Sequence, residues 1–234
     1  MSRVNLILVD GAVLLCACTT LPRKSAVSTP IAQSVVGDFS SGPRIRYSAF
    51  EDGAALRETI EQAFLTETPD SYVIGPSGEH IYNYLSISGG GSDGAFGAGL
   101  INGWTESGER PHFKVVTGVS TGALIAPFAF LGPDYDDELK ESYTTVDASR
   151  IFEALGLLPM LFSESAASTK PLQDLIATGV DDKVLDAIAV EYKKGRRLYV
   201  ASTNLDAEQP IIWDMGAIAS SNRPDRLALF RKVM

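Results

Sequence analysis

A serine flanked by glycines stands between an apolar run typical of a strand and an apolar run typical of a helix. Residues 118–122 fit the pattern G-x-S-x-G, with Ser120 at its centre. A serine held on a tight strand-to-helix turn has its hydroxyl pushed clear of the sheet, and only glycine tolerates the crowding two residues to either side. The helix N-terminus also favours negative charge that develops on a substrate oxygen. We therefore interpret Ser120 as a nucleophile for acyl transfer; the alternative is an ordinary helix-capping serine. The predicted elbow around it consists of Gly118, Val119, Thr121 and Gly122.

A second glycine-rich segment lies upstream, where the preceding apolar run ends. Its members are Gly89, Gly90, Gly91, Ser92, Asp93 and Gly94. Backbone N–H groups of such a loop point to the place where a carbonyl oxygen gains charge, so we predict that it forms an oxyanion hole. The letters also fit the dinucleotide pattern G-x-G-x-x-G. That alternative is less favoured, because a dinucleotide site needs an acidic residue at the end of the second strand, and this strand leads to Ser120 instead.

The positions of the histidines limit the choice of a catalytic base. His80 and His112 are the two histidines, and both precede Ser120, whereas an α/β-hydrolase triad runs serine, acid, histidine along the chain. Each stands at the entry of a predicted strand, so we interpret both as structural. A serine enzyme without histidine needs another base, and a carboxylate held close to the hydroxyl can serve.

The elements that must position these residues follow the order strand, glycine loop, helix. Strands are predicted at 81–88, 113–117, 198–203 and 211–213. Helices are predicted at 51–66, 95–104, 123–131 and 224–234, and between a cap at Asp181 or Asp182 and Gly195. Two consecutive units of this kind imply parallel strands joined by right-handed crossovers, hence an α/β sheet with helices on its faces.

Residues 85–95 and 118–124 together resemble the paired glycine loop and nucleophile elbow of patatin-like phospholipases. The similarity continues through 199–213, so that it covers the chain from about residue 80 to its end. The resemblance implies a three-layer α/β/α fold with a mostly parallel central sheet. It also implies a Ser-Asp dyad, an acyl-enzyme, and lipid carboxylic esters such as phospholipids as substrates, with no cofactor and no metal.

Two features depart from the pattern of that family. Many members carry Arg or Lys where this chain has Asp93, which changes the local field but not the backbone donors. The family's aspartate lies in D-G-G or D-G-A after the serine, whereas the D-G-A motifs at 10–12, 52–54 and 93–95 all precede Ser120. We assign none of them, expect the aspartate beyond Met234, and expect the 234 residues alone to be inactive or nearly so. The alternatives are a catalytically silent envelope lipoprotein scaffold and an acyltransferase on the same fold.

The N-terminal residues indicate export. The apolar stretch from Val4 to Ala17 is too short to span a membrane, so we predict a signal peptide at 1–17. Its end resembles a bacterial lipobox, which makes Cys18 the lipidated first residue of the mature chain. Residues 18–44 suit a flexible tether, followed by an acyl hydrolase domain at 45–234. We expect a membrane-anchored lipoprotein of the bacterial cell envelope; a plain secretory signal, giving a secreted or periplasmic protein, is the alternative.

Length, charge and cysteine content limit the number of domains and the kinds of partner and metal site that the chain can have. The 234 residues suit one domain, and 45% hydrophobic content is ample for a core. A formal net charge of −9 provides no electrostatic footprint for nucleic acid and repels anionic lipid headgroups. Both cysteines, Cys16 and Cys18, lie near the N-terminus, so no disulfide framework or cysteine metal site can be built from the remainder.

Overall fold

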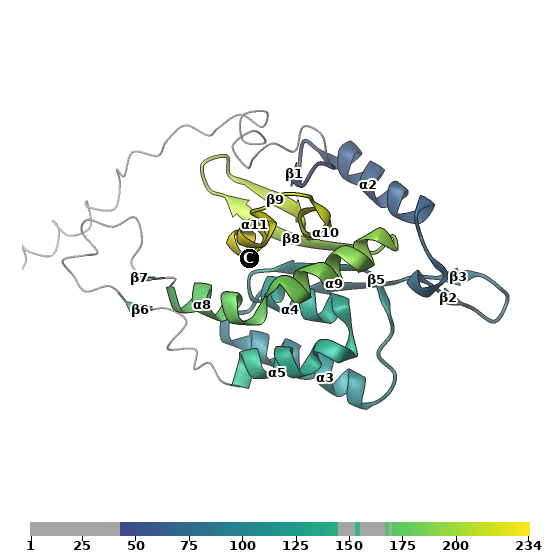
Figure 1. The fold of residues 1–234 in the computed structure, drawn as a ribbon, viewed down its shortest axis with the longest axis horizontal. Coiled ribbons are helices and arrows are strands. Elements are labelled where there is room, and N and C mark those ends of the chain that lie inside the picture. Colours follow the sequence, from purple (N-terminus) through teal and green to yellow (C-terminus); the bar gives the residue numbers. More distant parts are fainter. Residues whose placement is uncertain (1–42, 145–152, 155–166, 169) are drawn as a thin grey trace, which may run out of the picture.

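The computed structural model describes residues 43–144, 153–154, 167–168 and 170–234, and Figure 1 shows their arrangement. The predicted signal peptide, Cys18 and nearly all of the predicted tether lie outside these residues. Among the helices that the structure describes, none combines the length and the apolar character needed to cross a bilayer.

A five-stranded sheet forms the centre of the fold. Its strands are β1 (Arg46–Ser48), β4 (Asn83–Ile87), β5 (Phe113–Val119), β8 (Arg197–Asn204) and β9 (Gln209–Asp214). They lie in the order β1-β9-β8-β5-β4. Strands β4, β5 and β8 pair in parallel, whereas β9 runs antiparallel to both β8 and β1. The predicted mostly parallel sheet is confirmed, with β9 as the one reversed strand.

Helices cover both faces of this sheet (Figure 1). The helices are α2 (Gly53–Leu65), α3 (Gly94–Glu106), α4 (Thr121–Leu131), α5 (Asp136–Thr144), α8 (Lys170–Gly179), α9 (Asp182–Lys193), α10 (Met215–Ser220) and α11 (Arg226–Val233). Successive side chains of a strand point to opposite faces. Accordingly, Leu198 and Val200 of β8 join the core cluster that includes α4, and Tyr199 between them reaches α2, where its Oη lies 3.2 Å from Thr59 Oγ1. The arrangement is the three-layer α/β/α fold expected from the sequence.

The predicted strand at 81–88 is divided in the structure. Residues His80–Ile81 form β3, which pairs antiparallel with β2 (Val73–Ile74) in a separate small sheet, and β4 begins only at Asn83. Tyr82 lies at the break because its ring packs edge-on against Phe64 at 5.0 Å and its hydroxyl donates to Glu67 Oε1 at 3.0 Å. These contacts with the region of α2 separate the two strands.

Helix α4 lies at the centre of the core, packed along β5 and against β8 and α9. Eight of its residues are buried, among them Ile125 and Phe130, which are fully enclosed. A helix that is apolar nearly all round has to be buried. Its N-terminus is therefore fixed at the edge of the sheet where β5 ends.

Candidate active site

Ser120 occupies the turn between β5 and α4, as the sequence predicts. The strand ends at Val119 and the helix begins at Thr121. Ser120 has a φ of 54° and a ψ of −125°, a conformation that residues other than glycine rarely adopt. Ser120 is exposed, although it lies between two elements that are mostly buried, β5 and α4. Such strain, estimated at about 1–3 kcal/mol, persists only where the surroundings impose it, and it is typical of functional sites.

The two glycines of the elbow allow a close approach of main-chain segments. A Cβ atom at Gly118 would lie 2.3 Å from the carbonyl oxygen of Gly122, and one at Gly122 would lie 2.3 Å from the carbonyl oxygen of Ile87. Neither position has room for a side chain. The spacing of the glycines around Ser120 therefore follows from the packing of α4 against the ends of β4 and β5.

The upstream glycine loop lies directly against Ser120. Because β4 and β5 are parallel, with Ile87 paired to Gly118, both strands deliver their following loops to the same edge of the sheet. A Cβ atom at Gly89 would lie 2.7 Å from Ser120 Cβ and 3.3 Å from Ser120 Oγ. At the other end of the loop, a Cβ atom at Gly94 would lie 2.9 Å from Thr121 Cβ. The structure thus brings together the two segments that the sequence singles out.

Inside the loop, residues Gly91–Asp93 form a single 3-10 turn, in which Ser92 is the middle residue. Gly91 has a φ of 56°, in the region that favours glycine. The backbone N–H of Asp93 donates to the carbonyl oxygen of Gly90 at 3.0 Å, so this amide is engaged within the loop. Among the glycines of the loop, Gly89 is the one whose Cβ position lies against the serine side chain.

Ser120 has no candidate base hydrogen-bonded to it in the part of the chain that the structure describes. Within the described parts of the chain, no carboxylate or imidazole is hydrogen-bonded to Ser120 Oγ. His112 precedes β5 and Ser120 follows it, and seven strand residues span about 23 Å. Burial lowers the pKa of His112. His80, on β3, stacks on Tyr72 with ring centroids 3.8 Å apart. Both histidines therefore lie away from Ser120, and we interpret their contacts as structural.

Tyr143 supports the elbow through a contact that the sequence does not predict. It lies on α5, and its hydroxyl donates to the carbonyl oxygen of Thr121 at 3.2 Å. The same hydroxyl lies 3.2 Å from the position that a Cβ atom on Gly94 would take. Burial raises the pKa of Tyr143 to about 12, so the hydroxyl keeps its proton and remains a donor. No motif surrounds Tyr143 in the sequence, so nothing there signals this contact.

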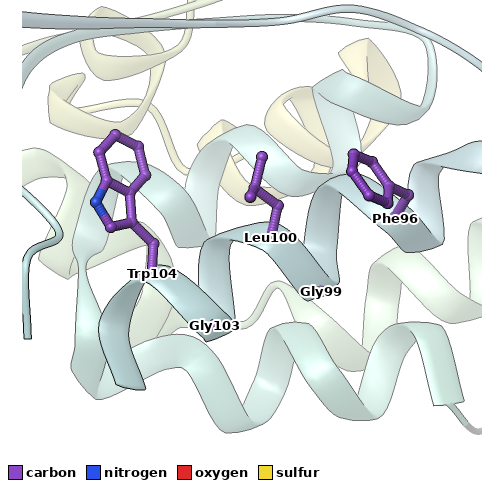
Figure 2. Close-up of a pocket in the computed structure, with 5 residues that line it drawn as sticks. All are labelled: Phe96, Gly99, Leu100, Gly103 and Trp104. Atoms are coloured by element: carbon purple, nitrogen blue, oxygen red, sulfur yellow. The ribbon is translucent and has the colours of Figure 1, made fainter. Parts of the chain in front are cut away.

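A shallow apolar hollow of about 750 Å³ lies along α3, the helix that follows the glycine loop. Its lining residues are Phe96, Gly99, Leu100, Gly103 and Trp104 (Figure 2).

In the described residues, no group of three or more His, Cys, Asp or Glu side chains is placed to hold a metal ion. The polar groups that the described residues bring together at this edge of the sheet include the hydroxyls of Ser120, Thr121 and Tyr143 and the main-chain groups around them.

Comparison with known proteins identifies a family. The model of a family described as patatin-like phospholipase matches residues 85–225. The matched range begins in β4, includes the glycine loop and the elbow, and ends just before α11. No curated protein and no solved structure matches the chain.

Proposed function

Because this chain belongs to the patatin-like phospholipase family, we propose that it is a serine acyl hydrolase that cleaves lipid carboxylic esters, with Ser120 as its nucleophile. The observation that carries this proposal is the exposed Ser120 on a positive-φ turn, with the backbone of Gly89 packed against its side chain. An ordinary helix cap needs neither feature, since capping residues commonly have extended backbone dihedrals.

The proposed reaction proceeds through an acyl-enzyme. Ser120 Oγ attacks the ester carbonyl carbon while a base takes its proton, and the carbonyl oxygen becomes an oxyanion. Amides of the loop from Gly89 to Gly94, other than the amide of Asp93 that is engaged within the loop, and the N-terminus of α4 stabilise that charge. The tetrahedral intermediate collapses with loss of the alcohol, which receives the proton from the base. Water then attacks the acyl-enzyme by the same route, releasing the fatty acid and restoring Ser120.

The base in this scheme is an aspartate, as in the Ser-Asp dyad of the family, and it lies outside the residues that the structure describes. Its expected place is beyond Met234. On this proposal the 234-residue chain alone hydrolyses esters slowly or not at all, and a chain extended to include the aspartate is active. Activity of the 234-residue chain equal to that of the extended chain would contradict this assignment of the base.

A fluorophosphonate probe tests the nucleophile. We expect the full-length protein to form one covalent adduct, located at Ser120 by peptide mass spectrometry, and the Ser120→Ala variant to form none. A folded protein that stays unlabelled would favour a catalytically silent scaffold. Product analysis with and without an alcohol acceptor separates hydrolysis from acyl transfer, because a transferase forms a new ester instead of free acid.

We further propose that the protein is a lipoprotein of the bacterial envelope, anchored through Cys18. The support is the apolar stretch that ends at Cys16 and Cys18, followed by a tether rich in Ser, Thr and Pro. Growth with a radiolabelled fatty acid should label the wild-type protein but not the Cys18→Ser variant. An unlabelled wild-type protein that is released in soluble form would point to a plain secretory signal, and equal labelling of both proteins would place the lipid on another residue.

A further inference from the structure

Three large apolar side chains project from one side of α3 (Figure 2). Phe96 is 76% exposed and Leu100 is 56% exposed, and Trp104 is partly exposed with its ring edge-on to Phe113 at 5.7 Å. Each follows the previous one by four positions, so the three occupy successive turns along about 12 Å of helix. We call Phe96, Leu100 and Trp104, with Gly99 and Gly103 between them, the α3 strip. It is the wall of the hollow already described.

The α3 strip starts where the candidate active site ends. The first residue of α3 is Gly94, the last residue of the glycine loop, and it packs against Thr121 beside the nucleophile. The opposite side of the helix faces inward, where Ala98 and Ile101 are buried. Helix α3 is thus held by the same packing that holds Ser120, and its first turn lies beside the reacting centre.

The chemistry of the strip indicates what covers it. Helix α3 has no charged residue before Glu106, and the chain as a whole carries a formal charge of −9. Helices that lie on a lipid surface typically place Trp, Phe and Leu on the apolar side. A stable protein interface needs roughly 20–30 residues from each partner, whereas five residues line this hollow. An uncharged lipid surface fits these features better than a second protein chain.

We propose that the α3 strip is the surface by which this protein contacts zwitterionic lipid, so that an ester in that lipid reaches Ser120 without leaving the aggregate. The inference deepens the proposed function and rests on it. Phe96 and Leu100 enter the boundary between headgroups and acyl chains. Trp104, farthest from the active site along the helix, lies at the headgroup level, where tryptophan is favoured.

Quenching of Trp104 by brominated lipid tests this contact directly. The chain has two tryptophans, so Trp213→Phe leaves Trp104 as the single emitter. We expect phosphatidylcholine vesicles with brominated acyl chains to quench the emission of this protein, and unbrominated vesicles to shift it to the blue. Adding Phe96→Asp and Leu100→Asp should weaken the quenching by roughly tenfold at a fixed lipid concentration, because charged side chains resist entry into the apolar layer.

Leu65→Asp is the matched control, since Leu65 is 77% exposed on another helix, α2. We expect that variant to be quenched like its parent. Circular dichroism and thermal unfolding of every variant verify that the fold is retained. The inference is overturned if Trp104 is not quenched by the vesicles, or if the Phe96→Asp, Leu100→Asp protein is quenched as strongly as its parent.

Two further measurements distinguish the lipid contact from the proposed enzyme activity and from self-association. Fluorophosphonate labelling of the full-length protein, which includes the proposed base, reports on the proposed function alone, so a quenched Trp104 with an unlabelled Ser120 in that protein would leave the lipid contact standing and refute the enzyme. Light scattering reports on self-association. A dimer that the Asp substitutions at Phe96 and Leu100 convert to a monomer would assign the α3 strip to a second copy of the chain and overturn the lipid contact.

Discussion

Ser120 keeps a strained backbone conformation because the residues around it leave no alternative. A side chain at Gly122 would meet the carbonyl oxygen of Ile87 at 2.3 Å, so the main chain itself would have to move. We expect Gly122→Ala to lower the free energy of unfolding by about 1–3 kcal/mol, as overpacking of a core does. The rate of fluorophosphonate labelling at Ser120 should fall by roughly 100-fold, because small displacements of reacting groups are costly.

The control for this substitution is Gly53→Ala at the start of α2, where nothing lies within 4 Å of the added Cβ atom. That change should leave the labelling rate unaltered and change stability only slightly. Urea unfolding and labelling kinetics measure both quantities. If Gly122→Ala labels as fast as the wild type, the elbow does not depend on the close contact of these two main-chain segments.

Tyr143 links the two segments of the site from a third element. Its hydroxyl donates to the carbonyl oxygen of Thr121 and also lies against Gly94. Tyr143→Phe removes one hydrogen bond and keeps the ring, so we expect stability to fall by about 1 kcal/mol. If the bond positions the elbow, kcat for a short soluble ester should fall several-fold while KM stays the same. Unchanged kcat with reduced stability would show that Tyr143 has only a structural role.

At the scale of the elements, Asp214 connects β9 to α10. It is fully buried, and its Oδ1 accepts the backbone N–H of Ala217 at 2.8 Å, which caps α10. Its Oδ2 is buried with no hydrogen-bond partner among the described residues. Burial raises the pKa of Asp214 from 3.8 to about 6, against the lowering effect of its backbone hydrogen bond to Ala217 and of Arg197. The cap is thus a carboxyl group that is costly to ionise.

This raised pKa gives a stability change with a definite sign. Between pH 4 and pH 6 the folded protein holds the Asp214 proton and the unfolded chain has released it, so the free energy of unfolding falls as pH rises through this window. A shift of about two pKa units corresponds to about 3 kcal/mol. We expect Asp214→Asn, which keeps the capping oxygen, to remove this fall. The measurement is the difference between wild type and variant in urea unfolding at pH 4, 5, 6 and 7.

Asp214→Ala provides the comparison, because it removes the cap and should be destabilising at every pH. A wild type and an Asp214→Asn variant with parallel pH profiles would show that the carboxyl group ionises at its ordinary pKa.

The elements that carry a local signal could be predicted from the sequence. The apolar run at 113–117, the glycine-flanked turn at 118–122 and the apolar run at 123–131 predict β5, the turn and α4, because each signal lies within a few neighbouring residues. Asp181 predicts a helix start in the same way, and its Oδ1 accepts the Val184 N–H at 2.9 Å. The glycine spacing also predicts that the two halves of the candidate site lie side by side.

Elements that depend on distant partners could not be predicted. Strand β1 has three residues and exists because Arg46, Tyr47 and Ser48 pair with β9, far along the chain. The division of β3 from β4 depends on contacts of Tyr82 with Phe64 and Glu67. Likewise, the contact of Tyr143 with Thr121 exists only once α5 has packed beside α4. Local periodicity contains no information about such pairs.

At the scale of the whole molecule, the sheet concentrates the reactive groups at one edge. Strands β4, β5 and β8 are parallel and in register, with Ile87 beside Gly118 and Val119 beside Ala201. The loops after β4 and β5 therefore emerge together, and one of them continues into α3. On the proposal above, lipid bound to the α3 strip lies along the helix that begins at the end of the glycine loop. The other end of β5 carries charged side chains: Lys114, near the start of the strand, pairs with Glu67 just after α2.

The net charge of −9 makes binding to a lipid surface depend on the charge of that surface and on the salt concentration. An anionic membrane repels the protein, and the repulsion is screened over about 10 Å at 0.1 M salt and about 3 Å at 1 M. We expect quenching of Trp104 by brominated vesicles that contain anionic phosphatidylglycerol to increase as sodium chloride is raised from low to high concentration. Quenching by purely zwitterionic vesicles should hardly change, because apolar contact is the main attraction there. A decrease with salt on anionic vesicles would instead mean that a basic region of the protein docks on the headgroups, which would assign membrane contact to a surface other than the α3 strip.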